Sequence, residues 1–113
     1  MNFGYLSVTA LLASLAIGGR ATAQVTEDPS LGAESTVVNL APGNGGSTYT
    51  ITGGATRGTN LFHSFDQFSI MAGDRAAFDH VNQIENIIGR VTGANISNLD
   101  GIIQANDGAN LFL

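Results

Sequence analysis

The clearest pattern in the chain is an alternation of apolar and polar residues around Tyr49 and Ile51, which are separated and flanked by threonines. A period of two predicts a half-buried β-strand, because successive side chains of a strand point to opposite faces. A short apolar patch at residues 37–40 precedes it, and the glycine-rich stretch 41–46 between them predicts a tight turn. This part of the chain therefore predicts a hairpin-like or capping arrangement of strands.

Two later segments carry apolar residues at less regular spacings. In residues 61–70 three phenylalanines recur at every third position, which fits neither a straight strand nor a regular helix and predicts a strand with a bend. In residues 81–91 the apolar positions fall at helical spacing, whereas their β-branched side chains and the internal Gly89 favour a strand. The pattern alone leaves helix and strand open for this second segment.

The last part of the chain again predicts short strands and turns. Residues 99–104 and 109–113 are expected to be strands. Residues 92–95 and 106–108 predict turns, the second because Asp-Gly favours hairpins and corners. Together with the earlier segments, these patterns predict an all-β fold.

The N-terminal segment has the features of an export signal. Residues 5–19 are apolar, and the small-x-small triplet 21–23 predicts signal-peptidase cleavage between Ala23 and Gln24. The apolar core at residues 6–17 is shorter than the roughly 20 residues of a membrane-spanning helix, so an anchor is not expected. A buried helix remains the alternative, because no Lys or Arg precedes the apolar run.

The predicted cleavage divides the chain into three parts. Residues 1–23 form the signal peptide, residues 24–36 an acidic leader, and residues 37–113 the folded domain. The signal peptide implies that the Sec export machinery moves the chain into the periplasm. The folded domain is therefore expected outside the cytoplasm.

Composition narrows the classes of function. The 113 residues include no cysteine and no lysine, and four scattered arginines leave a formal net charge of −5. Disulfide bonds and thiolate metal sites are excluded by the missing cysteine. Nucleic-acid binding is not expected, because it needs a basic patch to neutralise phosphates.

The residues that could carry chemistry do not form a recognisable catalytic or metal-binding pattern. His63 and His80 lack a third ligand at metal spacing. His63 adjoins Ser64, but neighbours on a strand point to opposite faces and cannot act as base and nucleophile. Sugar cleavage uses two carboxylates, and no two acidic residues stand in a recognisable pair. The candidates are Asp66, Asp74, Asp79, Glu85, Asp100 and Asp107. We therefore expect no catalytic residue, no metal, no cofactor and no small-molecule substrate.

Several strings of residues, in a fixed order, resemble one family. They are Ile51-Thr52-Gly53-Gly54, the run from Gly58 to Phe65, Ile87-Ile88, Arg90-Val91-Thr92-Gly93, Ser97-Asn98, Asp100-Gly101 and Ala109-Asn110-Leu111-Phe112-Leu113. On these strings the chain resembles the N-terminal secretion domain, or haemagglutination-activity domain, of filamentous-haemagglutinin-like two-partner secretion exoproteins. The similarity covers residues 37–113.

This resemblance implies both a fold and a function. The implied fold is the N-terminal part of a right-handed parallel β-helix with capping strands, in which residues 81–91 are strand. The implied function is to direct secretion of an adhesin: a partner outer-membrane transporter recognises the module in the periplasm, and the protein reaches the medium or the cell surface. The family continues into an Asn-Pro-Asn-Gly-Ile motif that this sequence lacks, which implies a truncated domain.

The resemblance also implies a set of secretion-motif residues: Asn60, Leu61, Phe62, Arg90, Asn98, Asp100, Asn110, Leu111 and Phe112. Asn-Leu-Phe occurs twice, which suits two rungs of a coil, and an asparagine amide can bridge backbone groups at a rung corner. Two other functions stay open: a fragment of a β-helix carbohydrate-active enzyme, and a non-functional gene fragment.

Overall fold

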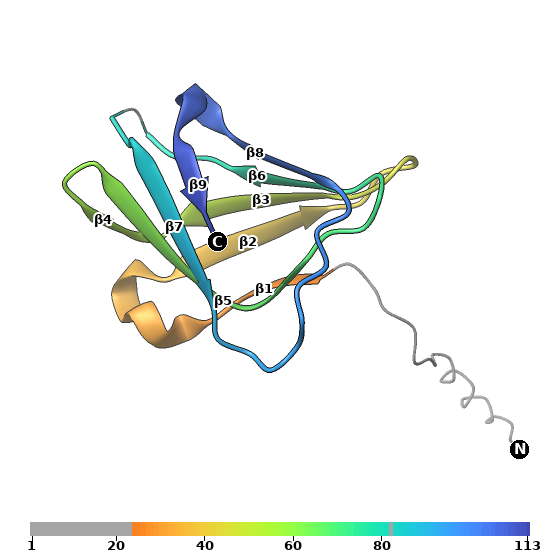
Figure 1. Cartoon of the computed structure of the whole chain (residues 1–113), viewed down its shortest axis with the longest axis horizontal. Helices are drawn as coiled ribbons and strands as arrows, with labels where there is room; N and C mark the ends of the chain where they lie inside the picture. The colour runs from red at the N-terminus through yellow and green to blue at the C-terminus, as the bar shows by residue number, and fades with distance from the viewer. Residues whose placement is uncertain (1–23, 82) are drawn as a thin grey trace, which may run out of the picture.

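The computed structural model describes residues 24–81 and 83–113, so the predicted signal peptide and its cleavage site at Ala23 lie outside or at the edge of the described residues. The described chain is mostly β (Figure 1). Its elements are β1 (Gln24–Glu27), η2 (Pro29–Glu34, a 3-10 helix), β2 (Thr36–Ala41), β3 (Thr48–Gly53), β4 (Ala55–Arg57), β5 (Asn60–Ser69), β6 (Arg75–Phe78), β7 (Asn86–Val91), β8 (Ile102–Ala105), η3 (Asn106–Gly108) and β9 (Asn110–Phe112). No helix in the described part of the chain is both long and apolar enough to span a membrane.

The strands form two mixed sheets. The five-stranded sheet has the order β1-β5-β7-β9, and β4 also pairs with β5. The four-stranded sheet has the order β2-β3-β6-β8. The all-β prediction is therefore confirmed. The described strands show no closed or coiled sheet, and the predicted right-handed β-helix is not identified in this arrangement.

Each sheet changes from antiparallel to parallel pairing along the chain. The early strands pair antiparallel: β1 and β4 with β5, and β2 with β3. The later strands pair in parallel. In one sheet β6 pairs with β3 and β8 with β6; in the other β7 pairs with β5 and β9 with β7. Figure 1 shows β3, β6 and β8 side by side in one sheet, with β7 and β9 in the other. The chain therefore alternates between the two sheets as it proceeds.

Three phenylalanines fill the centre between the sheets. Phe65, Phe68 and Phe78 are each at most 1% exposed, and the rings of Phe65 and Phe68 meet edge to face with centroids 4.9 Å apart. Phe65 and Phe68 are both buried because the register between β1 and β5 skips Asp66, which forms a β-bulge. The bend predicted from the threefold spacing is therefore confirmed as a bulge in β5.

Two glycines turn the chain from one sheet to the other. Gly53 and Gly54 end β3 and lead into β4, with φ angles of +74° and +86° that only glycine adopts without strain. A Cβ at Gly54 would lie 2.7 Å from the Phe62 carbonyl oxygen and 2.8 Å from Cε1 of His63. Gly54 therefore lets this corner of the chain lie close to β5.

The structure corrects two predicted boundaries. Residues 81 and 83–85 are not in a strand, because β7 begins at Asn86, and Val81 is 79% exposed. Leu99 forms only an isolated parallel bridge with Ile70, and β8 starts at Ile102. In the structure, residues 24–36 contain β1 and η2, and β1 pairs with β5; the proposed division between leader and domain stays a prediction.

The outer edges of β8 and β9 predict self-association. Among the described strands neither has a further neighbour, and Ile102 and Phe112 are each 55% exposed. We expect residues 24–113 to oligomerise with rising concentration in sedimentation experiments, and Phe112→Lys to lower the associated fraction by placing a charge on that edge. The matched control is Val81→Lys, which adds the same charge at an exposed apolar loop position. An equal effect of both variants, or a wild-type chain that stays monomeric, would contradict this prediction.

Candidate functional site

Six of the nine predicted motif residues lie in three rows across the five-stranded sheet: Asn60, Leu61, Phe62, Asn110, Leu111 and Phe112. In the register of β5, β7 and β9, Asn60 pairs with Asn86 and Asn86 with Asn110. The next positions align Leu61 with Ile87 and Leu111, and those after them align Phe62 with Ile88 and Phe112. The two Asn-Leu-Phe strings are therefore brought together, with a third string, Asn86-Ile87-Ile88, between them. Sequence reasoning missed this middle copy.

The asparagine row, which we call the asparagine ladder (Asn60, Asn86 and Asn110), is held by side-chain hydrogen bonds. Nδ2 of Asn86 donates to Oδ1 of Asn60 at 3.0 Å, and Nδ2 of Asn110 donates to Oδ1 of Asn86 at 3.1 Å. An amide carries both a donor and an acceptor, so each rung can bond the rung on either side. The amides here bond one another, whereas the sequence had predicted that they bridge backbone groups.

The other two rows face opposite sides of the sheet, because successive residues of a strand alternate. Leu61 and Ile87 are buried in the core, and Leu111 packs partly against it. Phe62 and Ile88 are half-buried on the outer side, and Phe112 is 55% exposed. The motif therefore supplies one core row and two surface rows.

Arg90 belongs to a second cluster, which joins the first residues of the fold to β5 and β7. Its Nε donates to Oγ of Ser64 at 2.8 Å, and its Nη2 donates to Oγ of Ser30 at 2.6 Å. Both hydroxyls in turn donate to Oδ2 of Asp28, at 3.0 Å from Ser64 and 3.1 Å from Ser30. Thr92 adds a third hydroxyl to the same carboxylate oxygen at 2.7 Å. We call this the Asp28 cluster: Asp28, Ser30, Ser64, Arg90 and Thr92.

The Asp28 cluster explains why an acidic residue is fixed at the start of η2. The backbone N–H of Ser30 donates to Oδ1 of Asp28, which makes Asp28 the N-cap of the 3-10 helix. Hydrogen bonds from Thr92, and then from Ser30 and Ser64, lower the pKa of this carboxyl. Asp28 is therefore held ionised while it links η2 to Ser64 in β5 and to Thr92, which follows β7.

His63 and Thr36 form a buried polar pair beneath this cluster. Oγ1 of Thr36 accepts from the backbone N–H of Ser64 at 2.9 Å and lies 2.9 Å from Nδ1 of His63. The imidazole is 2% exposed, between Phe65 and Phe78. Burial first, and the charge of His80 second, lowers the pKa of His63 to about 4, so the ring is neutral at physiological pH. Its role in the structure is to bond Thr36 within the core.

Asn98 and Asp100 lie apart from both groups. The carbonyl of Asn98 accepts from the N–H of Ile70 at 2.8 Å, and the N–H of Asp100 donates to the carbonyl of Ile70 at 2.8 Å. These backbone bonds hold the loop before β8 against the end of β5. The predicted motif residues therefore fall into an asparagine-led set of rows, the Asp28 cluster and this loop.

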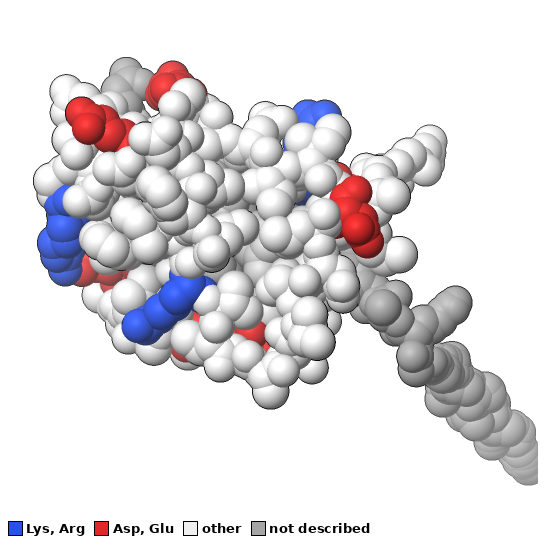
Figure 2. All heavy atoms as spheres, in the orientation of Figure 1, with Lys and Arg blue, Asp and Glu red and all other residues white. Residues whose placement is uncertain are grey.

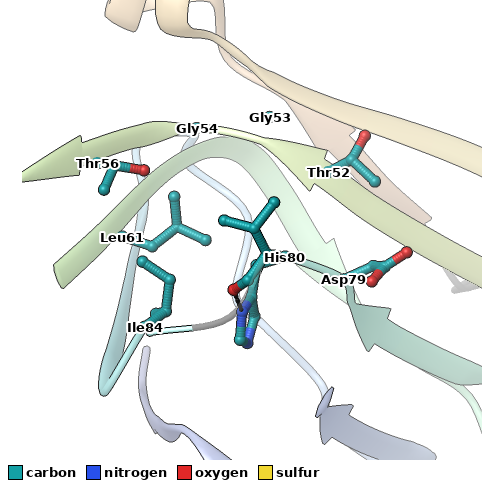
Figure 3. A pocket seen from close by; sticks show the side chains of 9 residues that line it. Thr52, Gly53, Gly54, Thr56, Leu61, Asp79, His80 and Ile84 are labelled. Atoms are coloured by element: carbon teal, nitrogen blue, oxygen red, sulfur yellow. Dashed lines mark hydrogen bonds between the residues drawn. The ribbon is translucent and has the colours of Figure 1, made fainter. Parts of the chain in front are cut away.

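A pocket of about 470 Å³ opens beside the glycine corner (Figure 3). Figure 3 shows Leu61 and Ile84 on one side and the His80 imidazole pointing away from Gly53 and Gly54. Nδ1 of His80 lies 2.6 Å from the Val81 carbonyl oxygen. Asp79 is the one carboxylate among its lining residues, whereas sugar cleavage uses two. Within the described residues, no group of three His, Asp or Glu side chains could hold a metal ion.

The charges on the surface do not gather into a basic patch. Figure 2 shows the basic side chains of one face set apart from one another, with acidic side chains between and around them. Arg57 is paired with Glu34 at 2.8 Å, which lowers the pKa of Glu34 and raises that of Arg57. Both side chains are largely exposed, so this ion pair contributes little to stability.

Aligned side-chain rows on parallel strands make this part of the chain a repetitive β module. The family model of the TPS secretion domain matches residues 23–113, and the chain belongs to this family. No curated protein and no solved structure matches the chain. Membership implies a module of a two-partner secretion exoprotein, a class typically without enzymatic activity, which a partner transporter recognises and which is exported through the periplasm.

The asparagine ladder predicts an order of effects on stability. Asn86→Ala removes both ladder bonds, so we expect it to lower the free energy of unfolding by about 1–2 kcal/mol in urea titrations. Asn110→Ala removes one bond at an exposed end and should cost less than about half of that. Equal losses, or a larger loss at Asn110, would show that the ladder does not stabilise the stack.

Burial of neutral His63 predicts a dependence of stability on pH. The pKa is lowered in the folded chain, so the unfolded chain takes up the proton first and the free energy of unfolding falls as the pH drops from about 6.5 towards 4. Asp28 and Glu34, with lowered pKa values, lose their contribution only below the ordinary carboxyl range. We expect His63→Gln to reduce the difference in stability between pH 7 and pH 5, and the control His80→Gln to retain most of it. If His80→Gln reduced the difference and His63→Gln retained it, His63 would not be the group that takes up the proton on unfolding.

Proposed function

We propose that residues 24–113 are the secretion-directing N-terminal module of a filamentous-haemagglutinin-like adhesin. In this proposal the periplasmic domains of an outer-membrane transporter bind the module and commit the chain to export to the medium or the cell surface. The module acts by binding, without a catalytic step. The observation that carries the proposal is the set of aligned rows at residues 60–62, 86–88 and 110–112, in a chain that belongs to the TPS secretion domain family.

We further propose that the two parallel stacks are the first turns of a right-handed β-helix. The paired positions support this: Thr48 aligns with Arg75 and Arg75 with Ile102 in one sheet, while Asn60 aligns with Asn86 and Asn86 with Asn110 in the other. One strand in each sheet is thus added for every 24 to 27 residues. Repetition at such a period is typical of solenoids, whose units stack only on their neighbours.

The antiparallel strands at the start of the chain suit the role of a cap in that β-helix. β1 and β4 cover the side of β5 that faces away from β7, and β2 covers the corresponding side of β3. A solenoid needs such a cap because its first turn otherwise presents an unpaired edge. The signal peptide at residues 1–23, cleaved between Ala23 and Gln24, completes the proposed organisation.

Export can be tested on the natural chain in its own cell. We expect material recovered from the periplasm to begin at Gln24 on N-terminal sequencing, because of the small-x-small triplet before it. We also expect deletion of the partner transporter gene to abolish release from the cell while the processed chain stays in the periplasm. A product that keeps Met1, or release that does not depend on any such transporter, would contradict the proposal.

The motif residues predict which substitutions impair secretion. Asn60→Ala and Asn110→Ala, in a chain extended to full domain length, should lower the secreted amount, because each removes a ladder bond and small losses of stability reduce protein abundance. Asp107→Ala is the control, because Asp107 is exposed in η3. Unfolding measured on each purified variant separates loss of folding from loss of contact with the transporter. A larger loss with the Asp107 variant would contradict a role of the ladder in secretion.

A further inference from the structure

The turn between β2 and β3 contains a pair of residues with its own chemistry. Asn44 is followed by Gly45, whereas every other asparagine of the chain is followed by a larger residue. A main-chain nitrogen can attack the side-chain amide of the asparagine before it, and glycine favours this attack because it has no Cβ to hinder the approach. Asparagine is accordingly among the thermolabile residues of proteins.

The structure leaves this connection, which we call the Asn44 turn (residues 43–46), open. Asn44 and Gly45 are both exposed, and a Cβ at Gly45 would have no atom beyond its chain neighbours within 4 Å. One long hydrogen bond closes the turn, from the N–H of Gly46 to the carbonyl of Gly43 at 3.4 Å, and the Gly45 N–H makes none within the described residues. In Figure 1 the turn projects beyond the strands of the four-stranded sheet. The fold therefore leaves the nitrogen and the side-chain amide free to meet.

Other asparagine amides are held in place by hydrogen bonds. Those of Asn86 and Asn110 donate within the asparagine ladder, and that of Asn106 donates to the carbonyl of His80 at 3.0 Å. A branched residue also follows each ladder asparagine, and its side chain crowds the main-chain nitrogen. Among the described residues, an exposed amide beside an unhindered nitrogen is therefore found at Asn44 alone.

We propose that Asn44 is a site of spontaneous deamidation. The Gly45 nitrogen forms a bond to Cγ of Asn44, the bond from Cγ to the amide nitrogen breaks, and that nitrogen leaves as ammonia with the proton of the Gly45 N–H. Water then opens the resulting cyclic imide at one of its C–N bonds. Opening at Cγ gives aspartate, and opening at the main-chain carbonyl gives isoaspartate, in which the main chain runs through the side-chain carbons. Either product adds a negative charge, and the reaction does not depend on the proposed function.

The modification falls beside a tight contact between two turns. The N–H of Ser47 donates to Oδ1 of Asp74 at 2.8 Å, and the N–H of Arg75 donates to the Ser47 carbonyl at 2.9 Å. A Cβ at Gly73 would lie 2.6 Å from the Gly45 carbonyl oxygen. These contacts lead into the first pair of β3 with β6. Isoaspartate lengthens the main chain at this contact and therefore weakens the start of the β3–β6 pairing.

Mass spectrometry of the purified chain measures the conversion. Trypsin cuts after arginine, so Asn44 lies in the peptide that ends at Arg57, where Asn39 is the only other asparagine. During incubation at mildly alkaline pH we expect this peptide to gain about 1 Da at Asn44, at least about tenfold faster than any other asparagine converts. Fragmentation by electron transfer distinguishes isoaspartate from aspartate. No gain at Asn44, or an equal gain at Asn39, would overturn the proposal.

A synthetic peptide of residues 41–48 tests whether the fold leaves the turn open. It carries the same Asn-Gly pair without the contacts of the folded chain. We expect Asn44 of the folded chain to convert within about tenfold of the rate in this peptide, because local openness of the backbone governs access to the reaction. Slower conversion than that would show that the fold holds the turn closed, and would overturn the proposal.

Variants test the attacking nitrogen. Gly45→Val places a branched side chain beside it, at a position where the structure leaves space, and should slow conversion at Asn44 at least about tenfold. The matched control Ala41→Val adds comparable bulk at an exposed position of β2 and should change the rate less than about twofold. If Gly45→Val proves unfolded by circular dichroism, Asn44→Gln remains, and it should abolish the gain in that peptide. Equal slowing by both valine variants, or a gain that persists in Asn44→Gln, would overturn the proposal.

Urea unfolding tests the effect on the β3–β6 pairing. The deamidated fraction of an aged sample separates from the parent chain on anion exchange through its added charge. This fraction contains isoaspartate, whereas Asn44→Asp adds the charge without lengthening the main chain. We therefore expect the deamidated fraction to unfold at a lower urea concentration than Asn44→Asp. Equal midpoints would overturn the effect on the pairing, and the mass measurements decide the modification itself.

Discussion

Parallel pairing in a fixed register is the interaction on which the rest of the structure depends. β7 pairs with β5 from Asn60 to Phe65 and β9 pairs with β7 from Asn86 to Ile88, so equivalent residues of these strands lie side by side. Leucine and isoleucine then meet in the core, asparagine meets asparagine, and aromatic or aliphatic residues align on the outside. A shift of register by one residue would bring the core row to the surface and break the asparagine ladder at the same time.

The start of the chain shows how such a stack is closed. Asp28, at the start of the first 3-10 helix, accepts hydrogen bonds from the hydroxyl groups of Ser64 in β5 and Thr92 after β7, both more than thirty residues away. Below it, Thr36 bonds both His63 and the backbone of β5. These bonds satisfy polar groups that the covering strands bury, which an apolar cap alone would leave unpaired. The hydroxyls of Ser30 and Ser64 also hold Arg90 of β7 in this network.

The sequence predicted part of this fold because some patterns report local geometry. Alternation around Tyr49 and Ile51 identifies β3, and the threefold phenylalanine spacing indicates the bulge at Asp66. Asn86 was missed because its string, Asn-Ile-Ile, differs from Asn-Leu-Phe. In addition, the three asparagines are separated by 26 and 24 residues, so they do not recur at a constant period.

Other features depend on contacts that no local pattern reports. The Asp28 cluster brings together residues separated by up to 64 positions. Gly89 is similar: it favoured a strand on sequence grounds, but a Cβ there would lie 2.7 Å from the Leu113 side chain, a close approach that only the fold creates. Chemistry-bearing residues such as His63 and Arg90 were visible in the sequence, whereas their partners were set by the topology.

Native-state hydrogen exchange of backbone amides tests the central claim of in-register stacking around β5 most directly. The account predicts the slowest exchange in β5 and β7, where the buried residues Leu61, Phe65 and Ile87 lie, and faster exchange in β8 and β9 at the uncovered edge. Protection that decreases from β5 towards β9 would support stacking that builds outward from β5. Equal protection in all strands, or the strongest protection in β9, would contradict it.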